Sequence, residues 1–273
     1  MNRGKKKQWL LLTTIIISIF HIIPMYLLMS TSFKNEGDLS SKWVFPKYLY
    51  LDNFKNAWEQ ANLGTAFINN IIITVVSVFL VLVIGALASY PLARFQTKLN
   101  KFMYMLCISA LIVPPLTILV PLYQFIVDLG GLNSYWAVIA LHVTFNLPMT
   151  IFLFTGFIST IPRELDEAAM IDGASRIGLF FRIILPLLKP VTVTVIILTG
   201  VAIWNDYQFS VFFLQSSEMA TITVALSKFF SMFNNNVGWV AAGSLMAMLP
   251  LTILYLFLQR YFIQGLSSGA VKD

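Results

Sequence analysis

The chain has 273 residues, of which 58% are hydrophobic and only 11% are charged, and its mean hydropathy is +0.79. This composition excludes a soluble globular domain and is typical of a protein that crosses a membrane several times. The net charge of +6 does not indicate nucleic-acid binding, because most lysines and arginines lie in short segments beside apolar stretches. The single cysteine, Cys107, excludes an intrachain disulfide.

Six apolar stretches are each long enough to cross roughly 30 Å of hydrocarbon as a helix. The first follows MNRGKKK and lacks a small-residue cleavage site, so we expect it to be retained as a span. Because backbone in lipid must satisfy its own hydrogen bonds, the sequence predicts an all-α membrane protein with one transmembrane domain over residues 1–273. The expected spans lie near residues 9–30, 67–90, 102–126, 136–158, 191–213 and 240–261.

The distribution of lysine and arginine predicts the orientation of these spans. With the N-terminus inside, the inner segments carry 13 of these residues and the outer segments carry 5. Cytoplasmic loops are the ones enriched in positive charge, so both termini are expected in the cytoplasm. The first outer loop mixes four lysines with four acids, and we expect it to form a small cap over the bundle. Gly85, Ala86, Ala88 and Ser89 form a small-residue face suited to close helix contact.

A charged segment separates the fourth and fifth apolar stretches. Four acids and three arginines lie between Arg163 and Arg182, so lipid cannot host this part and it should lie in water on one side of the membrane. Pro162 suits a first helical position, the acids that follow favour a helix start, and Gly173 can end the helix. Ala168 and Ala169 present almost no side chain, so another protein could approach closely. The alternative is a loop helix that packs only against its own bundle.

Motifs for independent chemistry are missing from the sequence. No Gly-x-x-x-x-Gly-Lys-Ser/Thr loop is present, so the chain should not hydrolyse ATP through a P-loop. His21 and His142 lie far apart in apolar spans and are expected to be packed or hydrogen-bonded, so we assign no metal site and no catalytic residue. Ion-coupled carriers keep ionisable groups at mid-depth, and the nearest candidate is Asp206 near the outer end of a span. Energy should therefore come from a partner.

The charged segment resembles the signature of ABC-transporter permease subunits, which is Glu-Ala-Ala, three residues, Gly, nine residues, Ile, one residue and Leu-Pro. Three further stretches, 67–95, 202–214 and 249–273, resemble sugar-importer permeases, and the last of these is similar to the terminus of the maltose-type second permease. Together these stretches cover nearly the whole chain. The fixed positions of the signature are filled by Glu167, Ala168, Ala169, Gly173, Ile183, Leu185 and Pro186.

This resemblance implies a six-span permease in the MetI-like arrangement of ABC importers, in the plasma membrane of a prokaryote. It implies a heterodimer with a second permease, a dimer of ATPase subunits that bind ATP and magnesium, an extracytoplasmic sugar-binding protein, and no cofactor on this chain itself. The expected function is ATP-driven import of a sugar or oligosaccharide, not enzymatic catalysis. An importer of another solute, such as an amino acid or peptide, an ion-coupled carrier and a membrane enzyme are the alternatives.

The resemblance also implies residue roles. Within a cytoplasmic loop at 160–186, the expected ATPase-coupling residues are Arg163, Asp166, Glu167, Ala168, Ala169, Asp172, Gly173 and Pro186. A tail at 262–273 would reach the ATPase subunits through Gly265, Gly269 and Lys272, unless it is a frayed end. A binding-protein contact is expected at Asn234, Asn235 and Asn236, unless this run is simply a turn. Candidates for the substrate path, more suited to structural or gating roles than to direct sugar contact, are Trp204, Asn205, Asp206, Tyr207, Asn146 and Tyr123.

Overall fold

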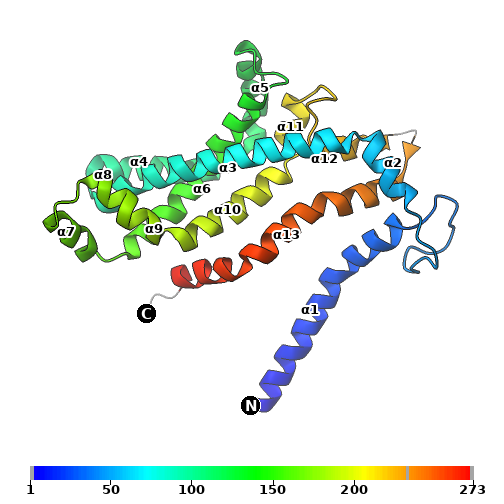
Figure 1. The fold of residues 1–273 in the computed structure, drawn as a ribbon, viewed down its shortest axis with the longest axis horizontal. Helices are drawn as coiled ribbons and strands as arrows, with labels where there is room; N and C mark the ends of the chain where they lie inside the picture. Colours follow the sequence, from blue (N-terminus) through cyan, green and yellow to red (C-terminus); the bar gives the residue numbers. More distant parts are fainter. Residues whose placement is uncertain (1–2, 232–233, 271–273) are drawn as a thin grey trace. The chain divides into compact units, whose positions relative to one another are not determined.

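The computed structural model describes residues 3–231 and 234–270 of the chain (Figure 1). Contacts within this part divide the chain into two compact units. The first contains Met1–Phe67 and Ile222–Leu249, and the second contains Ile68–Thr221 and Pro250–Asp273. Two long helices, α3 (Leu63–Arg94) and α13 (Val237–Ala270), contribute residues to both units.

The first unit is built on α1 (Arg3–Ser32), α2 (Asp52–Gln60) and α12 (Ile222–Ser227). Two-residue strands, β1 (Phe230–Ser231) and β2 (Asn234–Asn235), pair antiparallel with Ser231 opposite Asn234. The loop between α1 and α2 is held by the Lys34 ammonium, which donates to the Ser40 hydroxyl at 2.7 Å and the Ser41 carbonyl at 2.7 Å. Asn53 of α2 fixes the loop's start, because its amide donates to the carbonyls of Ser32 and Lys34.

The second unit is a bundle of long helices joined by short ones. Its long helices are α3, α6 (Tyr135–Thr160) and α10 (Lys189–Trp204), with the end of α13. The shorter elements are α4 (Lys98–Ser109), η1 (Ala110–Ile112), η2 (Pro115–Ile118), α5 (Leu119–Asp128), α7 (Glu164–Ile171), α8 (Arg176–Leu179), η3 (Phe180–Ile184), α9 (Leu185–Leu187) and α11 (Gln208–Phe213).

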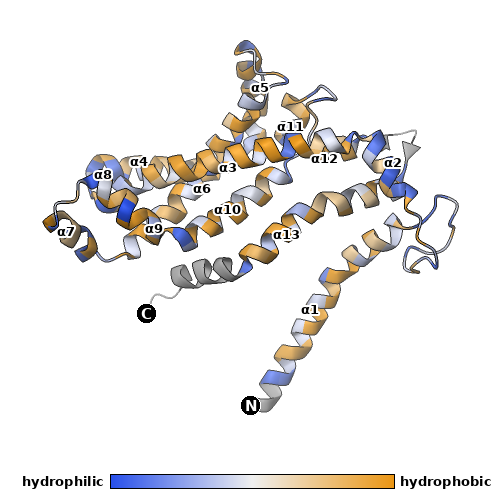
Figure 2. Ribbon diagram, in the orientation of Figure 1, coloured by the Kyte–Doolittle hydropathy of each residue, from blue (hydrophilic) through white to orange (hydrophobic). Residues whose placement is uncertain are grey.

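Four described helices are long and apolar enough to cross a membrane, and up to six spans result if each of two bent helix pairs counts as one. The four are Lys7–Ser32, Leu63–Arg94, Tyr135–Thr160 and Val237–Gln259, which confirms the expected spans near 9–30, 67–90, 136–158 and 240–261. Hydrophobic residues, orange in Figure 2, predominate along the described parts of these helices. Large apolar side chains of α1 are exposed along its length, as a lipid-facing helix requires.

Two of the expected spans, at 102–126 and 191–213, are broken rather than straight, and six spans result when each bent helix pair counts as one. The first stretch bends by 91° between Lys98–Ile112 and Pro115–Asp128. Pro114 and Pro115 remove two backbone donors and disfavour helical backbone before them, and Val113 is accordingly extended with ψ 114°. The second stretch is interrupted after Trp204, where α10 ends before α11 begins at Gln208.

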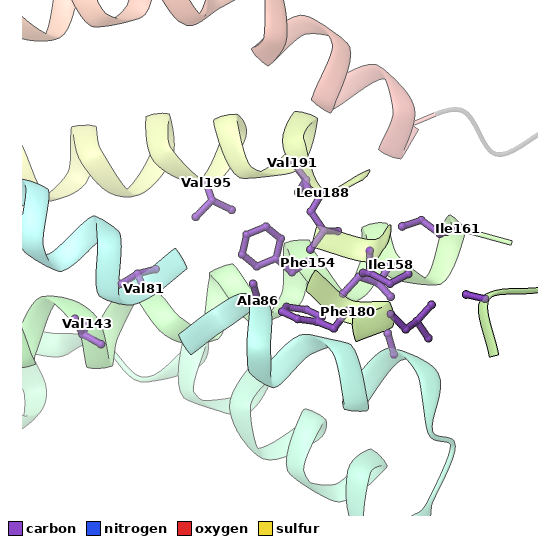
Figure 3. Close-up of a cluster of buried hydrophobic side chains, with 14 residues drawn as sticks. Val81, Ala86, Val143, Phe154, Ile158, Ile161, Phe180, Leu188, Val191 and Val195 are labelled. Carbon is purple, nitrogen blue, oxygen red and sulfur yellow. The ribbon is translucent and has the colours of Figure 1, made fainter. Parts of the chain in front are cut away.

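The core of the second unit forms where α3 and α6 approach closely. A Cβ atom added to Gly85 would lie 2.5 Å from the Thr150 methyl carbon, so only glycine permits this spacing. The Ser89 hydroxyl donates to the Ile151 carbonyl at 3.3 Å across the same contact, which supports the expected small-residue face. Figure 3 shows the side chains around it, which include Val81 and Ala86 of α3, Phe154 and Ile158 of α6, Phe180 of η3 and Val195 of α10.

Candidate functional site

The charged segment forms a first helix, α7, which ends as predicted but begins at Glu164, so the expectation that Pro162 is the first helical residue is wrong. Three acids occupy the first turn, where they complement the helix dipole. At the other end Gly173 has φ +84°, a left-handed conformation that glycine adopts without steric cost. The Gly173 amide donates to the Met170 carbonyl at 3.1 Å, and the Ala174 amide donates to the Ala169 carbonyl at 2.9 Å. This pair of hydrogen bonds is a Schellman ending, so Gly173 stops the helix through its backbone.

The outer face of this segment carries large exposed apolar side chains among its charged ones. Ile171 is 86% exposed and Ile177 of α8 is 71% exposed, and Ala168 and Met170 are also exposed. In a segment expected to lie in water, covering such side chains would be favourable by about 25 cal/mol per Å² of apolar surface removed from water. Exposed apolar groups rimmed by charges are typical of protein–protein contacts. Among the other expected coupling residues, Arg163, Glu167 and Asp172 are exposed as well.

Two of the expected coupling residues face inward instead. Ala169 is buried in the hydrophobic core of the second unit, and Asp166 is buried beside the end of α3. Asp166 was expected among the residues that contact the ATPase, but it is buried and is not part of the exposed surface. Its carboxylate is already held by Arg94, the last residue of α3, at 2.8 Å from Nε and 3.0 Å from Nη2. Of the alanine pair, only Ala168 is exposed.

A hollow of about 180 Å³ lies between α7, α8 and the end of α3. The Arg94–Asp166 pair contributes to its lining, and the exposed side chains of Arg163, Glu167 and Arg176 surround it. The Arg176 guanidinium lies 5.2 Å from the centre of the Phe95 ring, a cation–π distance. The surface that exposes Ile171 and Ile177 therefore also contains a hollow lined by charged side chains.

Pro186 lies where the segment returns to the bundle. It has no amide hydrogen, and a proline ring clashes with the carbonyl four residues earlier in a regular α-helix. The chain responds with the wider π-helical turn η3, which contains that residue, Arg182. The axis then bends by 70° between Arg176–Leu187 and Lys189–Trp204. Pro186 is exposed, and its expected coupling role stays a prediction.

The expected substrate-path residues Trp204 to Tyr207 form the break between α10 and α11. Trp204 is buried, whereas Asn205 and Tyr207 are exposed. The Asp206 carboxylate accepts hydrogen bonds from the backbone amides of Phe209 at 3.1 Å and Ser210 at 2.9 Å, and from the Ser210 hydroxyl at 2.8 Å. Asp206 therefore starts α11 by satisfying its first amides, which is a structural role.

His142 and Asn146 of α6 belong to the same polar region as Asp206. The His142 Nε2 atom lies 3.8 Å from an Asp206 carboxylate oxygen, and its ring meets Phe209 edge-on. The Asn146 amide donates to the His142 carbonyl one turn earlier, at 2.8 Å. His142 is thus packed as expected. Tyr123 lies elsewhere, against the ring of Phe213, so the structure does not join all six path candidates in one pocket.

The residues expected to contact the binding protein and the ATPase tail site lie in different environments. Asn234 and Asn235 form β2, while Asn236 is only 5% exposed and is therefore not the exposed loop-tip donor that we expected. Gly265 and Gly269 lie in the last turns of α13. Lys272 lies outside the described residues.

Sequence reasoning missed two buried asparagines at the opposite end of α3 from Arg94. The Asn69 amide donates to the carbonyls of Glu218 at 2.8 Å and Ala220 at 2.9 Å, and its carbonyl oxygen accepts from the Tyr135 hydroxyl at 2.7 Å. The Asn70 amide donates to the Trp204 carbonyl at 2.9 Å. Two adjacent amides inside the apolar run FINNIII were the available signal, because buried polar groups in a span need partners.

Within the described residues, no group of three histidines, cysteines or acids could hold a metal ion. The described part of the chain is instead a multi-pass helical bundle with a water-facing helix that presents apolar side chains, the architecture of a membrane transport subunit.

Residues 81–268 match the family model described as binding-protein-dependent transport system inner membrane component, and the chain belongs to this family. It is 52% identical over 271 residues to the melibiose/raffinose/stachyose import permease protein MelC of Bacillus subtilis (strain 168), covering 99% of this chain and 98% of that protein. It is 33% identical over 271 residues to the probable starch degradation products transport system permease protein AmyC of Thermoanaerobacterium thermosulfurigenes, covering 98% of each.

The fold is similar to a chain in the crystal structure of a bacterial ABC transporter involved in the import of the acidic polysaccharide alginate. The TM-score is 0.80 at 19% sequence identity, over 96% of this chain and 99% of that chain. This likeness confirms the expected importer-permease fold, and the family membership confirms the resemblance to ABC permeases.

Proposed function

We propose that this chain is the permease subunit of an ATP-driven, binding-protein-dependent importer of oligosaccharides in a prokaryotic plasma membrane. The observation that carries this proposal is the exposed apolar face of α7 and α8 on a family member that has no P-loop of its own. An ATPase subunit that covers Ile171 and Ile177 would supply the energy of ATP hydrolysis and would also remove these two side chains from water. Both termini and α7 are placed in the cytoplasm by the excess of lysine and arginine in those segments.

Transport then follows from alternating access. ATP draws two ATPase subunits together, and the displaced α7 favours an outward-facing state of this chain and of a second permease subunit. Each ligand shifts the equilibrium only by its difference in affinity for the two states. An extracytoplasmic binding protein loaded with sugar would favour the same outward state.

The docking surface is tested by placing a charge at its most exposed apolar residue. We expect Ile171→Glu to abolish copurification of the ATPase subunit and ATP-driven uptake into proteoliposomes, because the contact would bury an unpaired carboxylate. Leu39→Glu is a matched control, since Leu39 is 98% exposed in the loop between α1 and α2. Full assembly and uptake by Ile171→Glu would refute docking at this surface.

The substrate class is tested with the complete complex and its binding protein. Uptake of labelled melibiose, raffinose and malto-oligosaccharides in a deletion strain, with and without the restored gene, is expected to show gene-dependent oligosaccharide accumulation. The sugar names of MelC and AmyC motivate this panel. Gene-dependent uptake of amino acids or peptides without any sugar uptake would refute the sugar assignment, and uphill uptake by the purified chain alone would refute the ATP-driven mechanism.

A further inference from the structure

We infer that the buried Arg94–Asp166 ion pair is a positioning device that passes the displacement of α7 into α3, and through α3 to the break after Trp204. This inference rests on the proposed docking of an ATPase subunit to α7. It adds roles for Arg94, Asn69 and Asn70, which are not part of the exposed docking face.

The first step concerns how α7 is held. Arg94 and Asp166 make two contacts, a hydrogen bond from Nη2 to Oδ1 at 3.0 Å and an ion-pair contact of 2.8 Å between Nε and Oδ2, and their side chains are only 5% and 11% exposed. The same guanidinium donates through Nη1 to the Ile161 carbonyl at 2.9 Å, and Ile161 is the C-cap of α6. One side chain therefore ties the end of α3, the end of α6 and the first turn of α7 together. Contacts from three nitrogens of one planar guanidinium fix orientation as well as distance, which a single contact cannot do.

The second step concerns what else could fix the direction of α7. The helix has eight residues, and Asp166 and Ala169 are its buried positions. Helices this short are not stable alone and depend on tertiary contacts. Ala169 contributes a small apolar contact that has no directional preference. Among the described residues, the ion pair is therefore the directional side-chain contact that joins α7 to α3.

The third step follows α3 away from α7. This helix has 32 residues and spans about 48 Å at 1.5 Å per residue. Near its other end, Asn69 holds the carbonyls of Glu218 and Ala220, and Asn70 holds the carbonyl of Trp204. All of these residues belong to the second unit. A continuous helix fastened near both ends by buried polar contacts can carry a displacement from one end to the other. A position between two sites would not by itself show coupling.

The experiment compares Asp166→Asn with Glu164→Gln in the complete transporter. Both changes remove one carboxylate from α7, but Glu164 is exposed and makes no contact with Arg94 among the interactions of the described residues. We expect Asp166→Asn to keep the ATPase subunit bound and to keep ATP hydrolysis, while sugar transported per ATP falls about tenfold, within the usual range of coupling effects. Glu164→Gln should match the wild type. Arg94→Lys, which keeps the charge but loses the planar guanidinium that reaches Asp166 and the Ile161 carbonyl together, should resemble Asp166→Asn.

Hydrogen exchange supplies a second measurement that a merely structural role would not change. In the wild-type complex, ATP should alter the exchange of amides in residues 204–221. In Asp166→Asn, ATP should no longer do so although the ATPase subunit remains bound.

Three results would overturn the inference: unchanged transport per ATP in both Asp166→Asn and Arg94→Lys, loss of the ATPase subunit from Asp166→Asn, and no ATP effect on residues 204–221 in the wild type. The Ile171→Glu result separates the two proposals. If Ile171→Glu loses the ATPase subunit but Asp166→Asn stays fully coupled, docking holds and only the transmission role fails. If Ile171→Glu assembles and transports normally, the docking proposal itself fails.

Discussion

The contact between α3 and α6 offers a sharp quantitative test, because a single added methyl group should disrupt it. In Gly85→Ala the new Cβ would lie 2.5 Å from the Thr150 methyl carbon, about 1 Å or more inside an ordinary carbon–carbon contact of roughly 3.5–4.0 Å. Thr150 is fully buried and its hydroxyl donates to the Asn146 carbonyl at 3.0 Å, so it cannot rotate away freely. Overpacking of this kind costs about 1–3 kcal/mol.

Thr150→Ser supplies the matched rescue, because it deletes the methyl group that the new side chain would strike. Alone it should cost about 1 kcal/mol for the lost buried methyl. In the double variant the alanine methyl takes the vacated space, so we expect a favourable interaction energy of about 1–2 kcal/mol relative to the sum of the single changes. The assay is reversible unfolding of the purified chain in detergent, measured for all four members of the cycle. Strict additivity, or a Gly85→Ala variant as stable as the wild type, would refute the close-packing argument.

Two further predictions concern water-facing segments. Gly173→Ala should destabilise the end of α7 by about 1 kcal/mol because residue 173 has a positive φ, whereas Gly173→Asn should cost less. Hydrogen exchange of the α7 amides measures both losses. A Cβ at this position meets nothing within 4 Å in this chain, so a larger loss for Asn than for Ala would contradict a backbone cause. Hydrogen bonds from the Ser40 side chain, from Tyr48 and from the Ser40 amide lower the Asp38 pKa to about 2 from 3.8. A lowered folded-state pKa stabilises the loop above about pH 4, and that contribution is lost as the pH falls from about 4 to about 2. Exchange of amides 33–51, corrected for intrinsic rates, should therefore rise over that range in the wild type and stay flat in Asp38→Asn.

The sequence was sufficient for features that depend on neighbouring residues. Long apolar runs identified four spans, and Gly173 identified the end of α7, because a span and a helix ending are both local patterns. Pro114 and Pro115 were visible too, yet apolar composition does not reveal whether a proline pair kinks a helix or turns the chain by 91°. Which of the two occurs depends on the side chains from other parts of the chain that pack against the bend.

The features that sequence reasoning missed depend on residues far apart in the chain. Asp166 lies 72 residues from Arg94, and Asn69 lies 149 and 151 residues from its two carbonyl partners. A pattern of acids in a short helix shows that one face meets water, but not which acid turns inward. A single sequence contains no information on that pairing until the helices are placed.

The buried hydrogen bonds of Arg94, Asn69 and Asn70 can fix the relative orientation of helices in a membrane because of where their acceptor carbonyls lie. Helices in lipid gain little from hiding apolar surface against one another, so apolar faces alone define their relative orientation poorly. Ile161 and Trp204 offer carbonyls at helix ends, and Glu218 and Ala220 offer them in a non-helical segment. Backbone groups there lack intrahelical partners, so each side chain that reaches them gains a bond that water does not supply. Orientation is consequently fixed at the helix ends, while the mid-helix faces are held mainly by packing. A transporter built this way is expected to move by sliding along those faces, with its fastened ends travelling as units.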